Sequence, residues 1–371
     1  MAKKIISVFG SSVGREEIRE IASSIKAQWM GIGPKVRAFE RQFAERLHLK
    51  DFAMLDSGSN SLHMAVRLLD LPPGSEVILP SFTWISCAHA VVLSGHVPVF
   101  CDVDLNTYNV TAATIEPHMT KNTGAIMIVH YAGKPVRIDP ILQLGLPVIE
   151  DAAHAVDSKI GDRYCGSMGT LGMYSFDAIK NLASPDGGGI TANDSSLVER
   201  ARVLRYCGIG KSGFEASVTK YRWWEYNIAE FFPRFLPNDI AASIALAQLG
   251  KLDRLQQYRK QLWERYQDEF LKIDWLVRPA DPEADEQHSY FTYCVRILGG
   301  HRDRFAHYLY DNGIYSTLRY HPLHMNPIYR STAKLPITEQ LNEEALSLPL
   351  HPRLSDRDVN KIIRTVKKFK I

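Results

Sequence analysis

The chain has 371 residues, of which 45% are hydrophobic and 23% are charged, the composition of a globular protein long enough for a large domain and a smaller one. Its 44 basic and 41 acidic residues are spread along the sequence and give a net charge of only +3, which argues against nucleic-acid binding and against attachment to a membrane surface. Five widely spaced cysteines without a Cys-x-x-Cys pair, and no apolar run of membrane-spanning length, lead us to expect a cytoplasmic protein with free thiols and no metal site.

Short apolar runs alternate with amphipathic stretches between about residues 50 and 200. We predict strands at 52–55, 76–79, 97–101, 125–129 and 147–149, and helices that include 62–69, 85–93 and 194–206. Continuous apolar strands separated by helices indicate an α/β fold with a mostly parallel sheet covered by helices on both faces. Ligands bind at the carboxyl ends of the strands in such sheets.

Two candidate cofactor contacts follow the first strands. Gly58, Ser59 and Asn60 lie between a strand and a helix, where N–H groups, the helix dipole and small hydroxyl groups favour a phosphate. The alternative is an ordinary capped helix, since serine and asparagine are common N-caps. Trp84 follows the second strand and can cover a flat ring, although a core aromatic residue is the alternative.

The most informative residues are Asp151, which ends an apolar strand, and Lys180, which follows another and precedes a turn over residues 184–189. An aspartate and a lysine at one edge of a sheet are what a pyridoxal phosphate (PLP) enzyme needs. The lysine holds the cofactor as a Schiff base, and the aspartate keeps the pyridine nitrogen protonated. Taken alone, Asp151 also fits a helix N-cap and Lys180 a surface lysine. Ser175 adds a hydroxyl group near the same strand end.

The second half of the chain begins with an aromatic segment from about Gly208 to Pro237 that has no clear period, which indicates a functional or interface loop. Asn238 then caps a predicted helix that continues towards Tyr266. A strand at 291–297, a helix at 301–312 and a final helix opened by Ser355 predict a smaller α+β unit. We therefore divide the chain into a large domain, 1–250, and a small C-terminal domain, 251–371.

The chain resembles the DegT/DnrJ/EryC1/StrS family of PLP-dependent sugar-nucleotide aminotransferases, nearly from end to end. The resemblance is carried by Gly31–Pro34, Ser57–Leu62, Pro80–Trp84, Phe100–Asp104, His130–Gly133, Glu150–Ala155, Ser175–Gly189, Asp239–Ala242 and Leu348–Pro352. It implies PLP fold type I, in which a large domain with a mostly parallel mixed sheet precedes a small α+β domain. It also implies a homodimer with active sites at the subunit interface.

The same resemblance assigns roles to individual residues. Lys180 would be the Schiff-base lysine and Asp151 the partner of the pyridine nitrogen. Trp84 would stack on the ring, and His154 would lie near its phenolic oxygen. Ser175 and the backbone around Gly58 and Ser59 would hold the phosphate.

The chain departs from the family in the segment before the helix at Asp239. Many members have a Gly-x-Asn-x-Arg stretch there, whose asparagine reaches the phosphate in the partner subunit. Arg234 occupies the position of that asparagine, and an arginine side chain can also bind a phosphate group. Arg234 is therefore our candidate for the contact across the interface, with Asn238 as the alternative. His324 is a candidate substrate contact, because this region lies near the sugar in the family.

The function implied is transfer of an amino group from glutamate to a keto sugar nucleotide, at C4 of a 4-keto-6-deoxyhexose, to make an amino sugar for lipopolysaccharide, O-antigen or another glycoconjugate. Amination of a 3-keto sugar at C3 is an alternative. A PLP-dependent sugar dehydratase is a second one, disfavoured because some such enzymes have histidine in place of Lys180. A non-catalytic regulator of the PLP fold is the third, disfavoured because no DNA-binding extension is present. The role of the aromatic loop 213–237 stays open between dimer packing and sugar binding.

Overall fold

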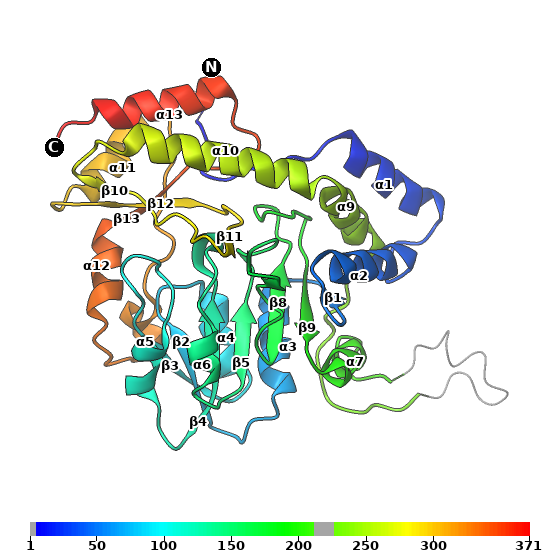
Figure 1. Cartoon of the computed structure of the whole chain (residues 1–371). Coiled ribbons are helices and arrows are strands. Elements are labelled where there is room, and N and C mark those ends of the chain that lie inside the picture. Colours follow the sequence, from blue (N-terminus) through cyan, green and yellow to red (C-terminus); the bar gives the residue numbers. More distant parts are fainter. Residues whose placement is uncertain (1–4, 211–225) are drawn as a thin grey trace.

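The computed structural model describes residues 5–210 and 226–371 of the chain. A seven-stranded sheet with helices on both faces forms the larger part, and a smaller sheet with its own helices lies beside it (Figure 1). The strands of the large sheet are β1 (Ala53–Leu55), β2 (Glu76–Pro80), β3 (Val97–Cys101), β4 (Thr123–Val129), β5 (Val148–Asp151), β8 (Leu171–Ser175) and β9 (Gly188–Ala192). The predicted mostly parallel sheet is confirmed.

The strands follow the order β1-β9-β8-β5-β4-β2-β3, and β9 alone runs against its neighbours. One predicted element is wrong here. Gly188 and Gly189, expected in a turn, belong to β9 and pair with β1 and β8. Glycine suits this strand because a Cβ on Gly189 would lie 2.0 Å from the ring of Phe52.

Side chains that alternate along the strands supply two apolar layers. Ile78, Ile126 and Tyr174 enter the layer that packs against α2 (Pro34–Arg46), together with residues of α9 (Asp239–Gly250). Their neighbours in sequence face the opposite layer, as strand geometry requires. That opposite layer packs against α3 (Gly58–Leu68), α4 (Ile85–Leu93) and α7 (Ser195–Leu204). The sheet is therefore buried on both faces, as its apolar strands indicated.

A third apolar cluster forms the core of the smaller unit. It lies between the sheet β10-β12-β13 and three helices, of which α10 and α13 run side by side in Figure 1. The elements are α10 (Leu252–Phe270), β10 (Leu276–Val277), β12 (Tyr293–Ile297), α11 (Arg302–Asp311), β13 (Ala345–Leu348) and α13 (Asp356–Lys368). Ile6 belongs to this cluster and bridges Ile314, so the N-terminal segment packs on the C-terminal unit. The domain boundary at residues 250 and 251 stays a prediction.

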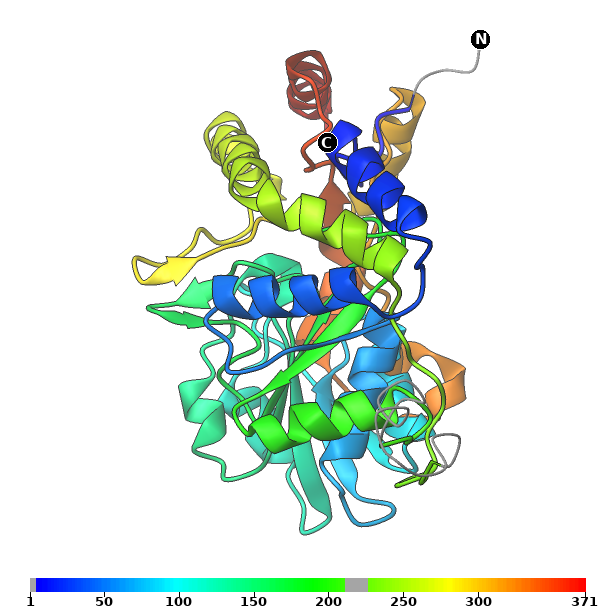
Figure 2. The same ribbon diagram turned by 90° about the vertical axis from the view of Figure 1, so that its right-hand side faces the viewer.

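Two helices near the N-terminus were not predicted, and one predicted helix is divided. In Figure 2, α1 (Arg15–Lys26) and α2 lie against α9 on the side that faces the viewer. The helix expected to run from Asn238 towards Tyr266 is interrupted at Lys251, where α9 ends and α10 begins. The start of α13 agrees with the sequence, since Ser355 and Asp358 form a capping box.

Shorter elements connect these parts. They are α5 (Ala112–Ile115), η1 (Glu116–His118), η2 (Tyr131–Gly133), α6 (Asp139–Leu142), η3 (Leu323–Met325), η4 (Pro327–Tyr329), α12 (Pro336–Glu344) and the sheet of β6 (Lys159–Ile160), β7 (Arg163–Tyr164) and β11 (Glu286–Gln287). Within the described ranges, no helix has the length and apolar character needed to cross a membrane. Part of the aromatic segment is core, because Phe232 and Phe235 are buried in the layer over α3. Residues 213–225 of the aromatic loop lie outside the described residues.

A buried carboxylate fixes the turn that leads into β8. Glu150 accepts backbone N–H groups of Gly166, Met168 and Gly169 and pairs with His130 at 2.9 Å. Because Nδ1 of His130 accepts the N–H of Val136, the proton of a neutral His130 lies on Nε2, which donates to Glu150. Glu150 thereby sets the path between β5 and β8, the two strands that lead to Asp151 and Lys180.

We expect Glu150→Ala to lower the free energy of unfolding by about 3 kcal/mol or more, because it leaves several buried donors without an acceptor. Urea denaturation at one fixed protein concentration measures the change. Glu116→Ala, at an exposed glutamate, is the control. Equal stability of the two variants would contradict this role of Glu150.

Candidate active site

A cavity of about 530 Å³ opens at the carboxyl edge of the large sheet. It is lined by seven residues that the sequence assigned to a cofactor site, namely Gly58, Ser59, Trp84, Asp151, His154, Ser175 and Lys180. They follow four different strands, because β1, β2, β5 and β8 all end at this edge. Residues separated by more than one hundred positions in sequence thus share one cavity.

The N-terminus of α3 faces the cavity and offers an anion site. The hydroxyl of Ser57 caps the helix by accepting the N–H of Asn60, and the first N–H groups of a helix have no partner within it. Gly58 permits close approach of β8, because a Cβ there would lie 2.6 Å from Cβ of Ser175. The hydroxyl groups of Ser59 and Ser86 lie 2.7 Å apart at the same end. This arrangement fits a phosphate group.

Asp151 ends β5 and is buried, with 5% of its surface exposed. Its Oδ1 accepts the N–H of Ala153 at 2.9 Å, and its Oδ2 accepts the thiol of Cys87 at 3.2 Å. No helix starts at Asp151, so the alternative of a helix N-cap does not apply. Both oxygens are held in place, and the carboxylate is presented to the cavity.

Lys180 follows β8 on a loop held by two hydrogen bonds to Asp177, from the N–H groups of Ile179 and Lys180. Its Nζ lies 4.9 Å from the centroid of the Phe291 ring. Loss of hydration and the charge of Arg319 lower the pKa of Lys180 to about 8, although Asp151 and Asp177 oppose the shift. Near neutral pH a useful fraction of this amine is therefore unprotonated and able to act as a nucleophile or a base.

His154 is a neutral, oriented imidazole. Burial and the charges of Lys180 and Arg319 hold its pKa well below the usual value. The ring stacks on Phe291 at 4.1 Å between centroids, and Nε2 lies 3.1 Å from the hydroxyl of Tyr320. Its Nδ1 is buried without a partner among the described residues. A buried polar atom without a protein partner is suited to bind a ligand.

Trp84 stands at the N-terminus of α4 and exposes 50% of its surface. Its ring lies 5.4 Å from that of Tyr320, at an angle of 51°. An aromatic face open to a cavity suits a flat ring, so the alternative of a core aromatic residue does not fit this tryptophan.

Three predicted residues lie away from the cavity lining. The side chain of Asn60 donates to Asp56 at 2.8 Å. Arg234 is exposed, and its backbone forms an isolated antiparallel bridge with that of Tyr206. Asn238, the alternative to Arg234, caps α9 by accepting the N–H of Ala241. His324 is buried between Ser81 and Glu339, at 2.7 Å and 3.3 Å. Their proposed contacts with cofactor, partner subunit and substrate stay predictions.

Sequence reasoning missed a second group of cavity residues. Arg319 and Tyr320 line the cavity from the C-terminal unit, and Phe291 lies beneath both Lys180 and Arg319. They follow no strand of the large sheet, so they cannot be predicted from the rule that ligands bind at the carboxyl ends of the strands. The available signal in the sequence was that Arg319 and Tyr320 come just before His324, in a region expected to lie near the substrate.

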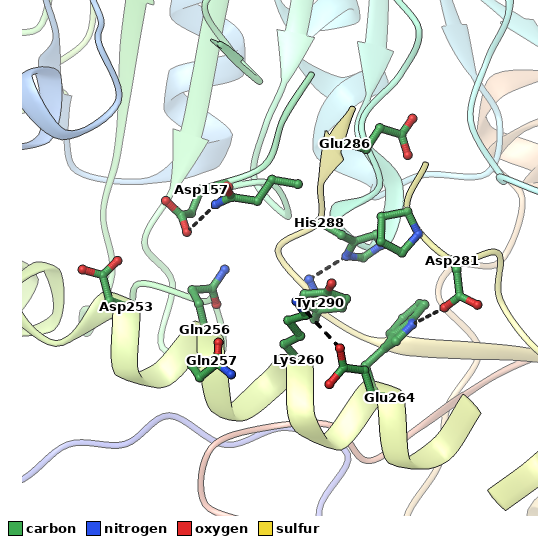
Figure 3. Close-up of a pocket in the computed structure, with 13 residues that line it drawn as sticks. Asp157, Asp253, Gln256, Gln257, Lys260, Glu264, Asp281, Glu286, His288 and Tyr290 are labelled. Carbon is green, nitrogen blue, oxygen red and sulfur yellow. Dashed lines mark hydrogen bonds and ion pairs between the residues drawn. The ribbon is translucent and has the colours of Figure 1, made fainter. Parts of the chain in front are cut away.

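A larger cavity of about 690 Å³ lies beside α10 (Figure 3). Five of its thirteen lining residues are acidic, and Figure 3 shows Asp157, Asp253, Glu264 and Asp281 around it. Negative charges repel a phosphate, and Lys260 is paired with Glu264 at 3.7 Å. The chemistry of the smaller cavity, where the anion site, the aromatic face and Lys180 meet, therefore fits the cofactor better.

The residues present fit PLP on these structural grounds. A phosphate suits the N-terminus of α3, a pyridine ring suits the open face of Trp84, and the buried Asp151 offers a carboxylate to a protonated ring nitrogen. The depressed pKa of Lys180 favours attack of its amine on an aldehyde.

The chain is similar to known proteins in both sequence and structure. The family model described as the DegT/DnrJ/EryC1/StrS aminotransferase family matches residues 11–367. The chain is 36% identical over 365 residues to the dTDP-4-dehydro-2,3,6-trideoxy-D-glucose 4-aminotransferase of Saccharopolyspora spinosa, covering 96% of this chain and 95% of that protein.

Two solved structures are also similar. The aminotransferase TlmJ from Streptoalloteichus hindustanus has a TM-score of 0.92 and 37% identity, with 98% of each chain covered. The PLP form of the putative sugar aminotransferase Spr1654 from Streptococcus pneumoniae has a TM-score of 0.91 and 26% identity, also with 98% of each chain covered.

Gly58→Ala is expected to weaken PLP binding about tenfold or more, because the added methyl group collides with Ser175 at the anion site. Titration of the apoprotein with PLP, followed by visible absorption, measures the affinity. Gly250→Ala is the control, since a Cβ there meets no atom within 4 Å. Unchanged PLP affinity in Gly58→Ala would place the phosphate elsewhere.

The pH dependence of PLP attachment should report the pKa of Lys180. Only the unprotonated amine attacks the aldehyde, so the rate should rise with pH and reach half its maximum near the depressed pKa of about 8. Stopped-flow absorption of apoprotein mixed with PLP gives this profile. A midpoint near 10.5, the ordinary pKa of lysine, would contradict the electrostatic account.

Proposed function

Since the chain belongs to the DegT/DnrJ/EryC1/StrS aminotransferase family, whose members are PLP-dependent sugar aminotransferases, we propose that it transfers an amino group from glutamate to a keto sugar nucleotide. The observation that carries the proposal is Lys180, which shares one cavity with Asp151 and has its pKa lowered to about 8. An amine poised near neutral pH suits both attachment of the cofactor and proton transfer.

The proposed acceptor is the C4 carbonyl of a 4-keto-6-deoxyhexose attached to a nucleotide, and the product is an amino sugar for lipopolysaccharide, O-antigen or another glycoconjugate. The similar protein of Saccharopolyspora spinosa, whose name gives a 4-aminotransferase for a deoxysugar nucleotide, supports this choice. Amination at C3 of a 3-keto sugar is the alternative.

PLP, when bound, supplies an electron sink that stabilises negative charge on the carbon next to the transferred nitrogen. The proposed work of Lys180 is to hold the cofactor covalently before the donor binds. Its released amine would then act as the base that takes the proton from the substrate carbon, and afterwards as the acid that gives the proton back. The hydrogen bonds to Asp177 fix the backbone of the loop that carries this amine.

The other residues would orient the cofactor and set its charge. Asp151 would hold the proton of the ring nitrogen, and the thiol of Cys87 fixes the carboxylate that does so. His154, neutral and stacked on Phe291, offers Nδ1 to an oxygen of the ring. Trp84 would cover the ring, and Ser175 with Gly58 and Ser59 would hold the phosphate.

We extend the proposal to a homodimer in the cytoplasm. Arg234 is exposed on the surface of the single chain, where it is free to reach the phosphate of a partner subunit, with Asn238 as the alternative. The presence of Lys180 disfavours the dehydratase alternative, in which a histidine at this position leaves the aminated cofactor free. A regulator would bind the cofactor without turnover.

Lys180→Ala should lose the visible absorption of the covalently held cofactor and lower transamination about 10²- to 10⁴-fold, because one residue supplies both the attachment and the proton transfer. Absorption spectra and single-turnover kinetics measure the two effects. Lys272→Ala, at an exposed lysine, is the control. Full turnover by Lys180→Ala would falsify the assignment.

The substrate is tested by product mass. Protein loaded with PLP is incubated with glutamate and, in separate reactions, with a 4-keto or a 3-keto 6-deoxyhexose nucleotide. One of the two nucleotides should give an amino sugar and an equal amount of 2-oxoglutarate. Loss of a hydroxyl group instead would identify a dehydratase, and binding without any product would identify a regulator.

A further inference from the structure

Asn181 follows Lys180 directly in sequence and is buried, with 3% of its surface exposed. It is not among the described residues that line the cofactor cavity. Its Nδ2 donates to the carbonyl oxygen of Ser289 at 2.6 Å and to Oε1 of Gln256 at 3.1 Å. Only the nitrogen of an amide side chain can donate to a carbonyl oxygen, so the orientation of this side chain is defined. Asn181 therefore joins the loop of Lys180 to a segment that lies 108 positions further along the chain.

Ser289 is a completely buried junction that also holds the backbone of His154. Its hydroxyl group donates to the carbonyl oxygen of His154 at 2.5 Å. Its N–H donates to Gly133 at 3.4 Å, and Gln256 donates to its carbonyl oxygen at 3.2 Å. The junction is tightly packed, because a Cβ on Gly133 would lie 2.1 Å from Oγ of Ser289. Asn181 and His154 are therefore bonded to the same fixed residue.

Phe291, two residues after this junction, contacts both Lys180 and His154. Its ring stacks on His154 at 4.1 Å between centroids, and Nζ of Lys180 lies 4.9 Å from the centroid of the same ring. The segment 289–291 thus packs against the side chain of Lys180 and is also bonded to the next residue, Asn181. The position of the amine relative to His154 depends on how the loop of Lys180 meets this segment.

We propose that Asn181 is a positioning residue, which holds the amine of Lys180 in place for the cofactor by bonding its loop to Ser289. The proposal rests on the proposed function, because it presumes that Lys180 is the residue that holds PLP. The hydrogen bonds to Asp177 do not supply this contact, because they lie within the loop itself. The bonds of Asn181 instead tie the loop to the distant segment against which Lys180 and His154 both pack.

Gln256 of α10 supports Asn181 from the C-terminal unit. Its Oε1 accepts Nδ2 of Asn181, and its Nε2 donates to the carbonyl oxygen of Ser289. Arg259, one turn along the helix, also donates to Oε1 of Gln256, at 3.4 Å. Because the oxygen of Gln256 faces two donors and its nitrogen faces a carbonyl oxygen, its amide has one favourable orientation. Asn181 and Gln256 bind the same carbonyl oxygen, so removal of either amide should loosen the loop.

The pKa of Lys180 reports the position of its amine. Burial and the charge of Arg319 lower this pKa to about 8. An amine that moves away gains hydration and leaves the charge of Arg319, so its pKa rises towards the ordinary value of lysine. The other titratable groups around the amine are Asp151, Asp177 and Cys87, which favour its charged form, and the neutral His154. None of these groups is altered when Asn181 is replaced, so a change in this pKa indicates a change in position.

The test is the pH profile of PLP attachment, measured by stopped-flow absorption of apoprotein mixed with PLP. In Asn181→Ala the midpoint should rise from about 8 by about one pH unit, so that attachment at pH 7 slows about tenfold. Gln256→Met retains Asn181 but removes its polar partner, and should shift the midpoint in the same direction by a smaller amount. This second variant decides the question if Asn181→Ala does not fold.

Gln267→Ala is the matched control for the loss of a buried amide. Gln267 also lies on α10 and exposes 6% of its surface. Its hydrogen bonds join it to residues of the C-terminal unit, namely Pro279, Asp281, Arg278 and Tyr293. This variant should lose thermal stability, as Asn181→Ala does, while its midpoint for PLP attachment stays near 8.

Binding of pyridoxamine phosphate separates the position of the amine from the fit of the cofactor. This compound has an amine in place of the aldehyde and forms no Schiff base with lysine. Calorimetric titration of the apoproteins should therefore give the same affinity for wild type, Asn181→Ala and Gln256→Met.

Three results would overturn the proposal. They are a midpoint that stays near 8 in both Asn181→Ala and Gln256→Met, an equal rise of the midpoint in Gln267→Ala, and loss of pyridoxamine phosphate affinity in Asn181→Ala. Failure of the proposed function looks different. Wild-type protein would then attach PLP without transamination, or Lys180→Ala would retain the absorption of the covalently held cofactor.

Discussion

The parallel pairing of β5 with β8 is the constraint on which the site depends. Ile149, Glu150 and Asp151 lie opposite Leu171, Gly172 and Met173, so both strands end at the same edge of the sheet. Asp151 and the loop that carries Lys180 are brought together by this register. A shift by one residue would turn Asp151 to the other face of the sheet. Glu150 strengthens the register, because it binds the turn that precedes β8.

Electrostatic balance inside the cavity is the second level of organisation. Two positive groups, Lys180 and Arg319, line the same cavity, and burial together with the charge of Arg319 makes Lys180 harder to charge. Asp151 and Asp177 favour the charged form of Lys180, while burial and the charges of Lys180 and Arg319 hold the pKa of His154 low. The cavity thus brings the pKa of one amine, that of Lys180, close to neutral pH.

The sequence predicted the strand ends well and the contacts between distant units poorly. Strands 97–101 and helix 85–93 have the predicted limits, because continuous apolar runs bounded by turn residues are read locally. Gly188 and Gly189 misled the prediction, since the local sequence does not distinguish glycine inside a paired strand from glycine in a turn. Arg319 was missed for another reason. Its position depends on how the C-terminal unit packs against the large sheet, and no local period records that packing.

The two substrates of a transaminase impose a further demand on this cavity. The amino donor and the keto sugar must use the same amine, Lys180, although one carries carboxylates and the other carries hydroxyl groups. The amine of Lys180 can serve both substrates only while it is unprotonated, and burial together with the charge of Arg319 lowers its pKa to about 8. The requirement that the two substrates share is therefore met at Lys180 itself.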